Sequence, residues 1–191
     1  GDVGTQAIAR ALQHNISVTH LSVSDNSIGD VGTQAIARAL KHNTTVTHLD
    51  LNGNNIGKEG GKAIAEALHS NTSVTHIDLC RNNIRDEACG AFGETLKHNT
   101  SITHLDFRGN NIGEKGGKSL LLSLTVNTIL LSLSVDFVTS HQSCDVELRP
   151  ISDGLELCCN GLGVWAKIVL AKLLRSNTSI THLDLRGNKI G

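Results

Sequence analysis

A single segment of sequence recurs along this chain at a spacing of 28 residues. Its first full copy reads VTHLSVSDNSIG, the next VTHLDLNGNNIG, and a later copy keeps only the leucine and asparagine positions. The copies are Val18–Gly29, Val46–Gly57, Val74–Arg85, Ile102–Gly113, Ser152–Gly163 and Ile180–Gly191. A fixed period of about 20–50 residues is the signature of a protein built from stacked units.

Each copy predicts a strand that is followed by a helix. Apolar and polar residues alternate in Val46–Leu51 (VTHLDL), as they do in a strand with one buried face. The later segment Ala63–Leu68 (AIAEAL) has apolar residues at helical spacing. One unit cannot bury its own apolar side, so neighbouring units share a continuous core. The sequence therefore predicts an α/β solenoid, a horseshoe with an inner parallel sheet and outer helices.

Asparagine recurs at position 9 of the copies, counting the first residue of each copy as position 1. These residues are Asn26, Asn54, Asn82, Asn110, Asn160 and Asn188. A buried amide can satisfy backbone groups where the chain turns out of a strand. We therefore expect a structural ladder of asparagine side chains.

The pattern L-x-x-L-x-L-x-x-N-x-L with a helical second half resembles the leucine-rich repeats of ribonuclease-inhibitor-like proteins. Similar repeats occur in NOD-like immune receptors, in Ran GTPase-activating proteins and in effectors of intracellular bacterial pathogens. The resemblance implies the horseshoe fold. It also implies a surface that binds another protein, and no cofactor.

Two features depart from a regular array. The interval 130–151 begins like a strand (LLSLSV), but no amphipathic helix follows, and Arg149-Pro150 excludes a helix there. We expect a helix-less repeat with an extended or hairpin-like excursion. The sequence also starts and stops within a repeat, without polar caps. The prediction is one leucine-rich-repeat domain over 1–191 that is a fragment of a longer protein.

Composition excludes several classes of function. The 17 basic and 18 acidic residues leave no basic excess for nucleic acid, and no apolar run is long enough to span a membrane. Five cysteines without regular spacing favour free thiols. No signal peptide is visible. We expect a cytoplasmic monomer, located in the host cytosol if the protein is a secreted effector.

The strand positions 3 and 5 carry histidine and mainly aspartate, and both project from the concave face. Adjacent strands lie about 4.8 Å apart, so we expect a histidine row beside an acidic row. The histidines are His20, His48, His76, His104 and His182, and the position 5 residues are Ser22, Asp50, Asp78, Asp106, Glu156 and Asp184. A solvated ladder is the favoured interpretation. Metal binding by neighbouring histidine or aspartate side chains is the alternative.

Two motifs suggest catalysis or phosphate binding, and neither has the spacing that this chemistry needs. His76, Asp78 and Cys80 lie about 6.6 Å apart along one strand, too far for a catalytic thiol relay, so we expect no enzyme. Gly113–Ser119 is one residue short of a phosphate-binding loop and has a counterpart at Gly60–Ala63.

Five glycosylation motifs begin at asparagines in one repeat position just after the helix, where asparagine can adopt a left-handed conformation. These asparagines are Asn15, Asn43, Asn71, Asn99 and Asn177. We interpret them as helix-end residues rather than glycosylation sites. Trp165 is expected to pack, with a contact site as the alternative.

Positions 7 and 8 vary between the copies, which favours recognition of a protein partner. The residues are Ser24 and Asp25, Asn52 and Gly53, Cys80 and Arg81, Arg108 and Gly109, Cys158 and Cys159, and Arg186 and Gly187. Arg81 and Arg108 are the expected hot spots, because arginine forms bidentate contacts. The predicted partner-binding residues are His48, Asp50, Asn52, His76, Asp78, Cys80, Arg81, His104, Asp106 and Arg108.

The predicted function is a non-enzymatic protein-interaction module, as an effector or an enzyme inhibitor. Residues 1–12 and 29–40 are identical, which indicates recent duplication and fits an expanding binding array. A GTPase-activating protein of the Ran-directed type is one alternative. A metal-responsive sensor that uses the histidine row is another.

Overall fold

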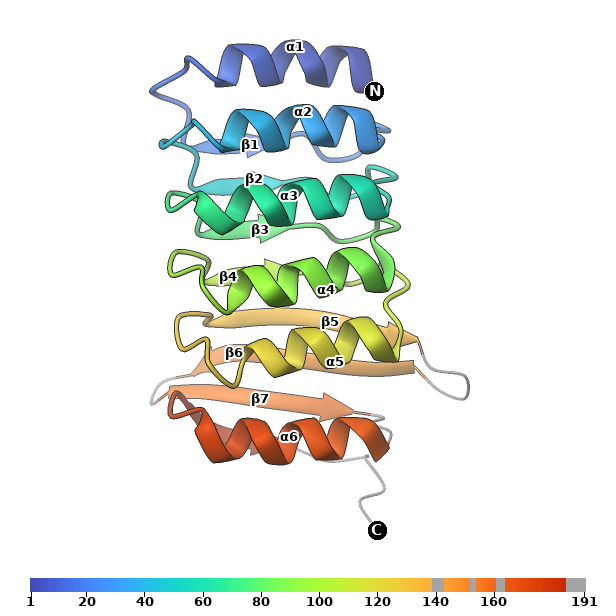
Figure 1. Cartoon of the computed structure of the whole chain (residues 1–191), viewed down its shortest axis with the longest axis vertical. Coiled ribbons are helices and arrows are strands. Elements are labelled where there is room, and N and C mark those ends of the chain that lie inside the picture. The colour runs from blue at the N-terminus through green and yellow to red at the C-terminus, as the bar shows by residue number, and fades with distance from the viewer. Residues whose placement is uncertain (139–142, 152–153, 161–163, 185–191) are drawn as a thin grey trace.

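Six helices stack in one layer over one face of a sheet (Figure 1). The computed structural model describes residues 1–138, 143–151, 154–160 and 164–184, with side chains described for 1–136, 146–149 and 170–183. The helices are α1 (Asp2–Leu12), α2 (Asp30–Leu40), α3 (Lys58–Ser70), α4 (Arg85–Leu96), α5 (Glu114–Ser123) and α6 (Val164–Ser176). The first and last helices lie at opposite ends of the molecule, so the fold is the expected solenoid.

The eight strands pair in the order in which they follow one another along the chain. They are β1 (His20–Ser22), β2 (His48–Asp50), β3 (His76–Asp78), β4 (His104–Asp106), β5 (Ser132–Val138), β6 (Ser143–Ile151), β7 (Gly154–Asn160) and β8 (Ile180–Asp184). From β1 to β5 the pairing is parallel, and each residue pairs with its equivalent in the next repeat. The 28-residue period therefore sets the strand register.

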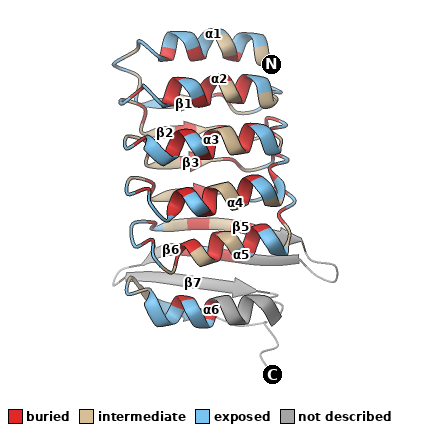
Figure 2. Cartoon of the chain, viewed as in Figure 1, coloured by how far each residue is buried: buried red, intermediate tan, exposed pale blue. Residues whose placement is uncertain are grey.

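The core lies between the helices and the sheet. Leu49 at the centre of β2 is 2 % exposed, while His48 and Asp50 on either side of it face the concave surface. From the helix side, Ile36 and Leu40 of α2 are fully buried, and Figure 2 shows buried and exposed residues on the same helices. The core is aliphatic, apart from one edge-to-face contact between Phe92 and Phe107 with ring centroids 4.8 Å apart.

The asparagines at position 9 form the expected ladder, for which we use the name turn ladder: Asn26, Asn54, Asn82 and Asn110. Asn54 is fully buried, and its Nδ2 donates to the carbonyl of Val23 in the previous repeat and to that of Leu51. Its Oδ1 accepts from the backbone N–H groups of Asn26 and Ile28. The amides of Asn54, Asn82 and Asn110 therefore each join two repeats, whereas Nδ2 of Asn26 donates to carbonyls of its own repeat. The side chain of Asn160 and residue Asn188 lie outside the described residues.

The asparagines that begin the glycosylation motifs form a second ladder at the ends of the helices. Asn71 is 6 % exposed, and its Nδ2 donates to the carbonyls of Leu40 and Asn43 in the previous repeat. Its Oδ1 accepts from the N–H groups of Ser73 and Val74. We name Asn43, Asn71, Asn99, Asn127 and Asn177, which share this pattern, the helix-end ladder.

The expected left-handed conformation of these asparagines is wrong, because the backbone of Asn71 is extended with φ −78° and ψ 129°. Its amide bonds to the preceding repeat instead, which needs no left-handed turn. Asn43 and Asn99 are as buried as Asn71, so a glycan cannot be attached to them in the folded chain. Asn127 lies outside any glycosylation motif but belongs to the same ladder.

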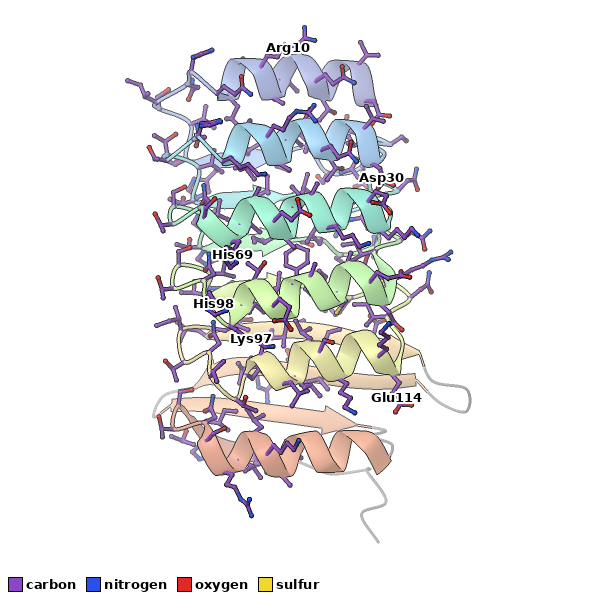
Figure 3. The ribbon with its side chains drawn as sticks, in the orientation of Figure 1. Arg10, Asp30, His69, Lys97, His98 and Glu114 are labelled. Carbon is purple, nitrogen blue, oxygen red and sulfur yellow. The ribbon has the colours of Figure 1, made fainter. Side chains whose placement is uncertain are left out.

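Aspartates cap the start of the next helix. Oδ1 of Asp30 in α2 accepts from the N–H groups of Gly57 and Gly60 at the N-terminus of α3, at 2.7 and 2.9 Å (Figure 3). Asp2 makes the same contacts to Gly29 and Gly32. These oxygens occupy the place where a helix N-terminus would otherwise attract an anion.

The segment that resembles a phosphate-binding loop is one of these capped starts. The N–H of Gly113 donates to Asp86 of the preceding helix, and Gly117 donates to the Gly113 carbonyl as the first turn of α5. The start of α4 does not have this aspartate–glycine cap. Lys58 of α3 occupies the aspartate position, and Arg85 occupies the glycine position.

Segment 130–151 contains strands β5 and β6, which pair antiparallel from Leu133–Leu148 to Val138–Ser143. β6 also pairs antiparallel with β7, which corrects the expectation of an entirely parallel inner sheet. The reason is the short connection at 139–142, since parallel neighbours need a long crossover. Helix α6 nevertheless packs on α5, and Asn177 donates to the Leu124 carbonyl across the two added strands. That the chain is a single domain and a fragment stays a prediction.

Candidate protein interface

Four histidine rings stack along the concave face. The centroids of His20, His48, His76 and His104 follow one another at 4.0 Å, with interplanar angles of 9–14°. The 28-residue register places each ring directly beside the next, so the predicted histidine row exists on β1–β4. We name these four residues the histidine ladder.

Burial and the proximity of other histidines favour the neutral imidazole at three positions of the ladder. The pKa values of His48, His76 and His104 are lowered, first by burial and then by the charge that a neighbouring histidine would carry. Two imidazolium rings in face-to-face contact would repel each other strongly. The neutral form of His48, His76 and His104 is therefore favoured at neutral pH.

The stacked geometry opposes a metal bound by the histidines. A metal needs nitrogen lone pairs that converge at about 2.0–2.1 Å, whereas the lone pairs of stacked parallel rings point in parallel directions. Among the described residues, the one group of potential ligands that lies close enough is Asp78, Cys80 and Asp106. Both oxygens of Asp106 already accept hydrogen bonds from the Arg108 guanidinium, which places a competing cation at that group.

Beside the histidines runs the predicted acidic row, Asp50, Asp78 and Asp106, which we name the carboxylate row. Asp50 accepts from the Ser22 hydroxyl at 2.7 Å and from the N–H of Asn52 at 3.0 Å. Asp78 is half-buried, and burial raises its pKa, helped by the charges of Asp106 and Asp50 on the neighbouring strands. Within the described part of the chain, only Asp106 of the three is in an ion pair.

The two arginines proposed as hot spots differ in their surroundings. Arg108 makes a bidentate pair with Asp106, with Nη2–Oδ2 at 2.5 Å, and this hydrogen-bonded pair raises its pKa. The guanidinium of Arg81 has no ion-pair partner among the described residues. Its φ is +55°, the left-handed conformation that the equivalent residues Asp25, Gly53 and Gly109 also have. Part of the variation at position 8 therefore comes from backbone geometry.

The predicted partner-binding residues lie together and line two hollows. The concave groove, about 470 Å³, runs between the histidine ladder and the carboxylate row from β1 to β5. A second hollow, about 440 Å³, lies at the ends of the strands and is lined by Asn52, Cys80, Arg81, Arg108 and Gly109. The first hollow is rich in acceptors, and the second contains both arginines.

The thiol of Cys80 gives no support to catalysis. Burial raises its pKa, and the charges of Asp106 and Asp78 raise it further. A catalytic cysteine needs the opposite shift, towards a thiolate. Cys89 is fully buried in α4. Trp165 belongs to α6, but its side chain lies outside the described residues, as do those of Cys144, Cys158, Cys159, Glu156 and Asp184.

The convex face carries polar residues that the sequence patterns did not single out. His69 and His98 meet edge to face with centroids 5.6 Å apart, and Lys97 pairs with Glu94 (Figure 3). Both histidines lie near helix ends outside the repeated strand motif. None of the described helices is long and apolar enough to cross a membrane.

Comparison with known proteins identifies the family. The leucine-rich repeat model matches residues 14–37, 42–65, 70–93, 98–121 and 176–191, more than half of the chain. The chain therefore belongs to the leucine-rich repeat family. The first four matches begin at 28-residue intervals, as the repeat does. Among curated proteins, no sequence matches significantly.

Solved structures share the fold. Leiomodin-1 actin-binding site 2 matches with a TM-score of 0.66 and 21 % identity, over 91 % of this chain and 87 % of that one. The tropomodulin C-terminal domain of Caenorhabditis elegans matches with a TM-score of 0.63 and 10 % identity, over 90 % and 92 %. Both structures therefore support the leucine-rich-repeat fold of this chain.

Proposed function

We propose that this protein binds a partner protein through its concave face, across β1–β4 and the second hollow. The observation that carries the proposal is the exposed cation of Arg81 beside a groove, which has no ion-pair partner in the described part of the chain. The left-handed backbone belongs to this repeat position, since Asp25, Gly53 and Gly109 share it, so the feature particular to Arg81 is its exposed cationic side chain. The acceptor-rich groove and the arginine-lined hollow give the face an uneven charge pattern, which supports specific recognition.

Capture of the partner tests this proposal. The immobilised chain is compared with Arg81→Glu and Arg108→Glu, and proteins recovered from a cell extract are quantified by mass spectrometry. Arg38→Glu on α2 is the matched control, because Arg38 is exposed on a helix and its charge reversal leaves the concave face unchanged. We expect each concave variant to reduce recovery of the partner about tenfold or more, since a hot-spot arginine contributes about 2 kcal/mol or more.

The opposite pattern overturns the proposal. If Arg38→Glu abolishes recovery while both concave variants retain it, the partner binds the helices. Purified actin is a defined first probe, because the similar domain of leiomodin-1 is an actin-binding site.

The identity of the captured protein also addresses the finer predictions. The effector, enzyme-inhibitor and GTPase-activating functions stay predictions from resemblance, as do the ribonuclease-inhibitor-like subclass, the cytoplasmic location and the monomeric state. A small GTPase, an enzyme or a host protein as the captured partner distinguishes among these functions.

A further inference from the structure

The groove between β2 and β3 offers hydrogen-bond acceptors. Its polar side chains at positions 3 and 5 are His48, Asp50, His76 and Asp78. Ionised carboxylates are acceptors only, with room for about four hydrogen bonds each. Whether the imidazoles donate or accept towards the groove depends on their tautomers.

The hydrogen bonds of the threonines fix those tautomers. The hydroxyl of Thr75 donates to the Thr47 carbonyl at 3.1 Å, so its single hydrogen is in use. The contact of 2.8 Å between that hydroxyl and Nδ1 of His76 must then be donated by Nδ1–H. Thr47 and His48 repeat the arrangement. Nε2 of both histidines is therefore an acceptor, and no described residue bonds to it.

The carboxylates of the same two repeats form no ion pair among the described residues, although the charge of Arg108 acts on Asp78 from the neighbouring strand. In β4 the position 7 residue is Arg108, which pairs with Asp106 in its own repeat. The equivalent residues after β2 and β3 are Asn52 and Cys80, so Asp50 and Asp78 have no ion pair among the described residues. These carboxylates are on adjacent strands, about 4.8 Å apart, and repel each other.

We propose that an arginine side chain of the partner protein binds here, between Asp50, Asp78 and the Nε2 atoms of His48 and His76. The proposal rests on the concave-face function above and specifies its chemistry. A guanidinium group has five donors and no acceptor, which matches the carboxylate oxygens and Nε2 atoms at this place in the groove. Its planar fork can span two carboxylates, whereas the lysine ammonium is a single point charge. Arg108 on Asp106 shows the same pairing within the chain.

A short peptide of alternating glycine and arginine, labelled with fluorescein, tests the proposal by fluorescence anisotropy. We expect saturable binding, and binding at least about tenfold weaker, or about 1.4 kcal/mol, for peptides with lysine or uncharged citrulline in place of arginine. Equal affinity for the citrulline peptide overturns the charge argument. Equal affinity for the lysine peptide overturns the assignment to a guanidinium group.

Two variants locate the site. Asp78→Asn keeps the acceptor for the Cys80 N–H but removes the charge, and Cys80→Arg supplies a competing guanidinium like Arg108. We expect both to weaken binding of the arginine peptide about tenfold, while Glu66→Gln on the exposed face of α3 leaves it unchanged. An equal loss with Glu66→Gln places the binding elsewhere. Circular dichroism confirms that each variant is folded.

The outcome separates this inference from the proposed function. If the peptide does not bind while Arg81→Glu still removes the captured partner, the concave face binds a partner of different chemistry and the arginine assignment is wrong. If the peptide binds as expected while partner capture depends only on the helices, the arginine site stands and the concave-face function fails.

Discussion

At the scale of single residues, Arg81 has two properties that it shares with Arg85. It is an exposed cation, and its left-handed backbone would suit glycine better. Arg81→Gly should therefore raise the free energy of unfolding by about 0.5–1 kcal/mol while weakening partner binding. Urea denaturation measures the first effect, and capture of the partner measures the second.

Arg81→Ala is the matched control for that prediction. It removes the guanidinium but keeps a Cβ in the left-handed conformation, so it should weaken binding without the gain in stability. If the two variants are equally stable, the backbone at this position is not strained.

The helix-end ladder makes a second residue-scale prediction. Asn71→Ala leaves the carbonyls of Leu40 and Asn43 and two N–H groups without their amide partner in a buried place. We expect a loss of about 2–4 kcal/mol in the free energy of unfolding, measured with urea. Asn15→Ala should cost less, because Asn15 is only partly buried. Equal losses would contradict a burial effect.

At the scale of elements, the junction between α3 and α4 tests the capping scheme. Lys58→Asp and Arg85→Gly together install the aspartate and glycine found at the other junctions. We expect the double variant to be more stable than the sum of the single variants, by about 0.5 kcal/mol or more. A double-mutant cycle of denaturation free energies measures this coupling. Strict additivity would show that the two positions do not form a cap.

The periodicity of the sequence was enough to predict the strand register, the buried leucines and the turn ladder, because those features depend on one repeat and its copy. The capping pairs were missed, since Asp30 and Gly57 come from different repeats. The sequence did contain a sign of this pairing. Where Lys58 replaces the aspartate, the matching glycine is also replaced, by Arg85. The stacking of the histidine rings and the ion pair of Arg108 depend on side-chain geometry, which spacing alone does not determine.

At the scale of the whole molecule, the histidine ladder makes stability depend on pH. The pKa values of His48, His76 and His104 are lowered in the folded chain, so the unfolded chain binds more protons below about pH 6.5. Stability should therefore fall as the pH drops from about 7.5 through this range. The raised pKa of Asp78 has the opposite effect, because it increases stability as the pH falls through the range in which Asp78 titrates. The other charged groups that face the histidine ladder are Asp50, Asp106 and Arg108.

Thermal unfolding at a series of pH values measures this dependence. His76→Gln interrupts the ladder at an inner position and should flatten the curve between about pH 7 and 5. A variant that keeps the full slope would show that the stacked rings are not its source.

The two strands added between α5 and α6 change the bend of the molecule. In an ordinary repeat the sheet advances by about 4.8 Å and the helix layer by about 8–10 Å, so the sheet becomes the inner arc. Between α5 and α6 the sheet advances by three strand spacings, about 14 Å, for a single helix step. The arc is therefore opened there instead of tightened. A partner that fits the curvature of β1–β4 must end near β5 or change its own shape to continue.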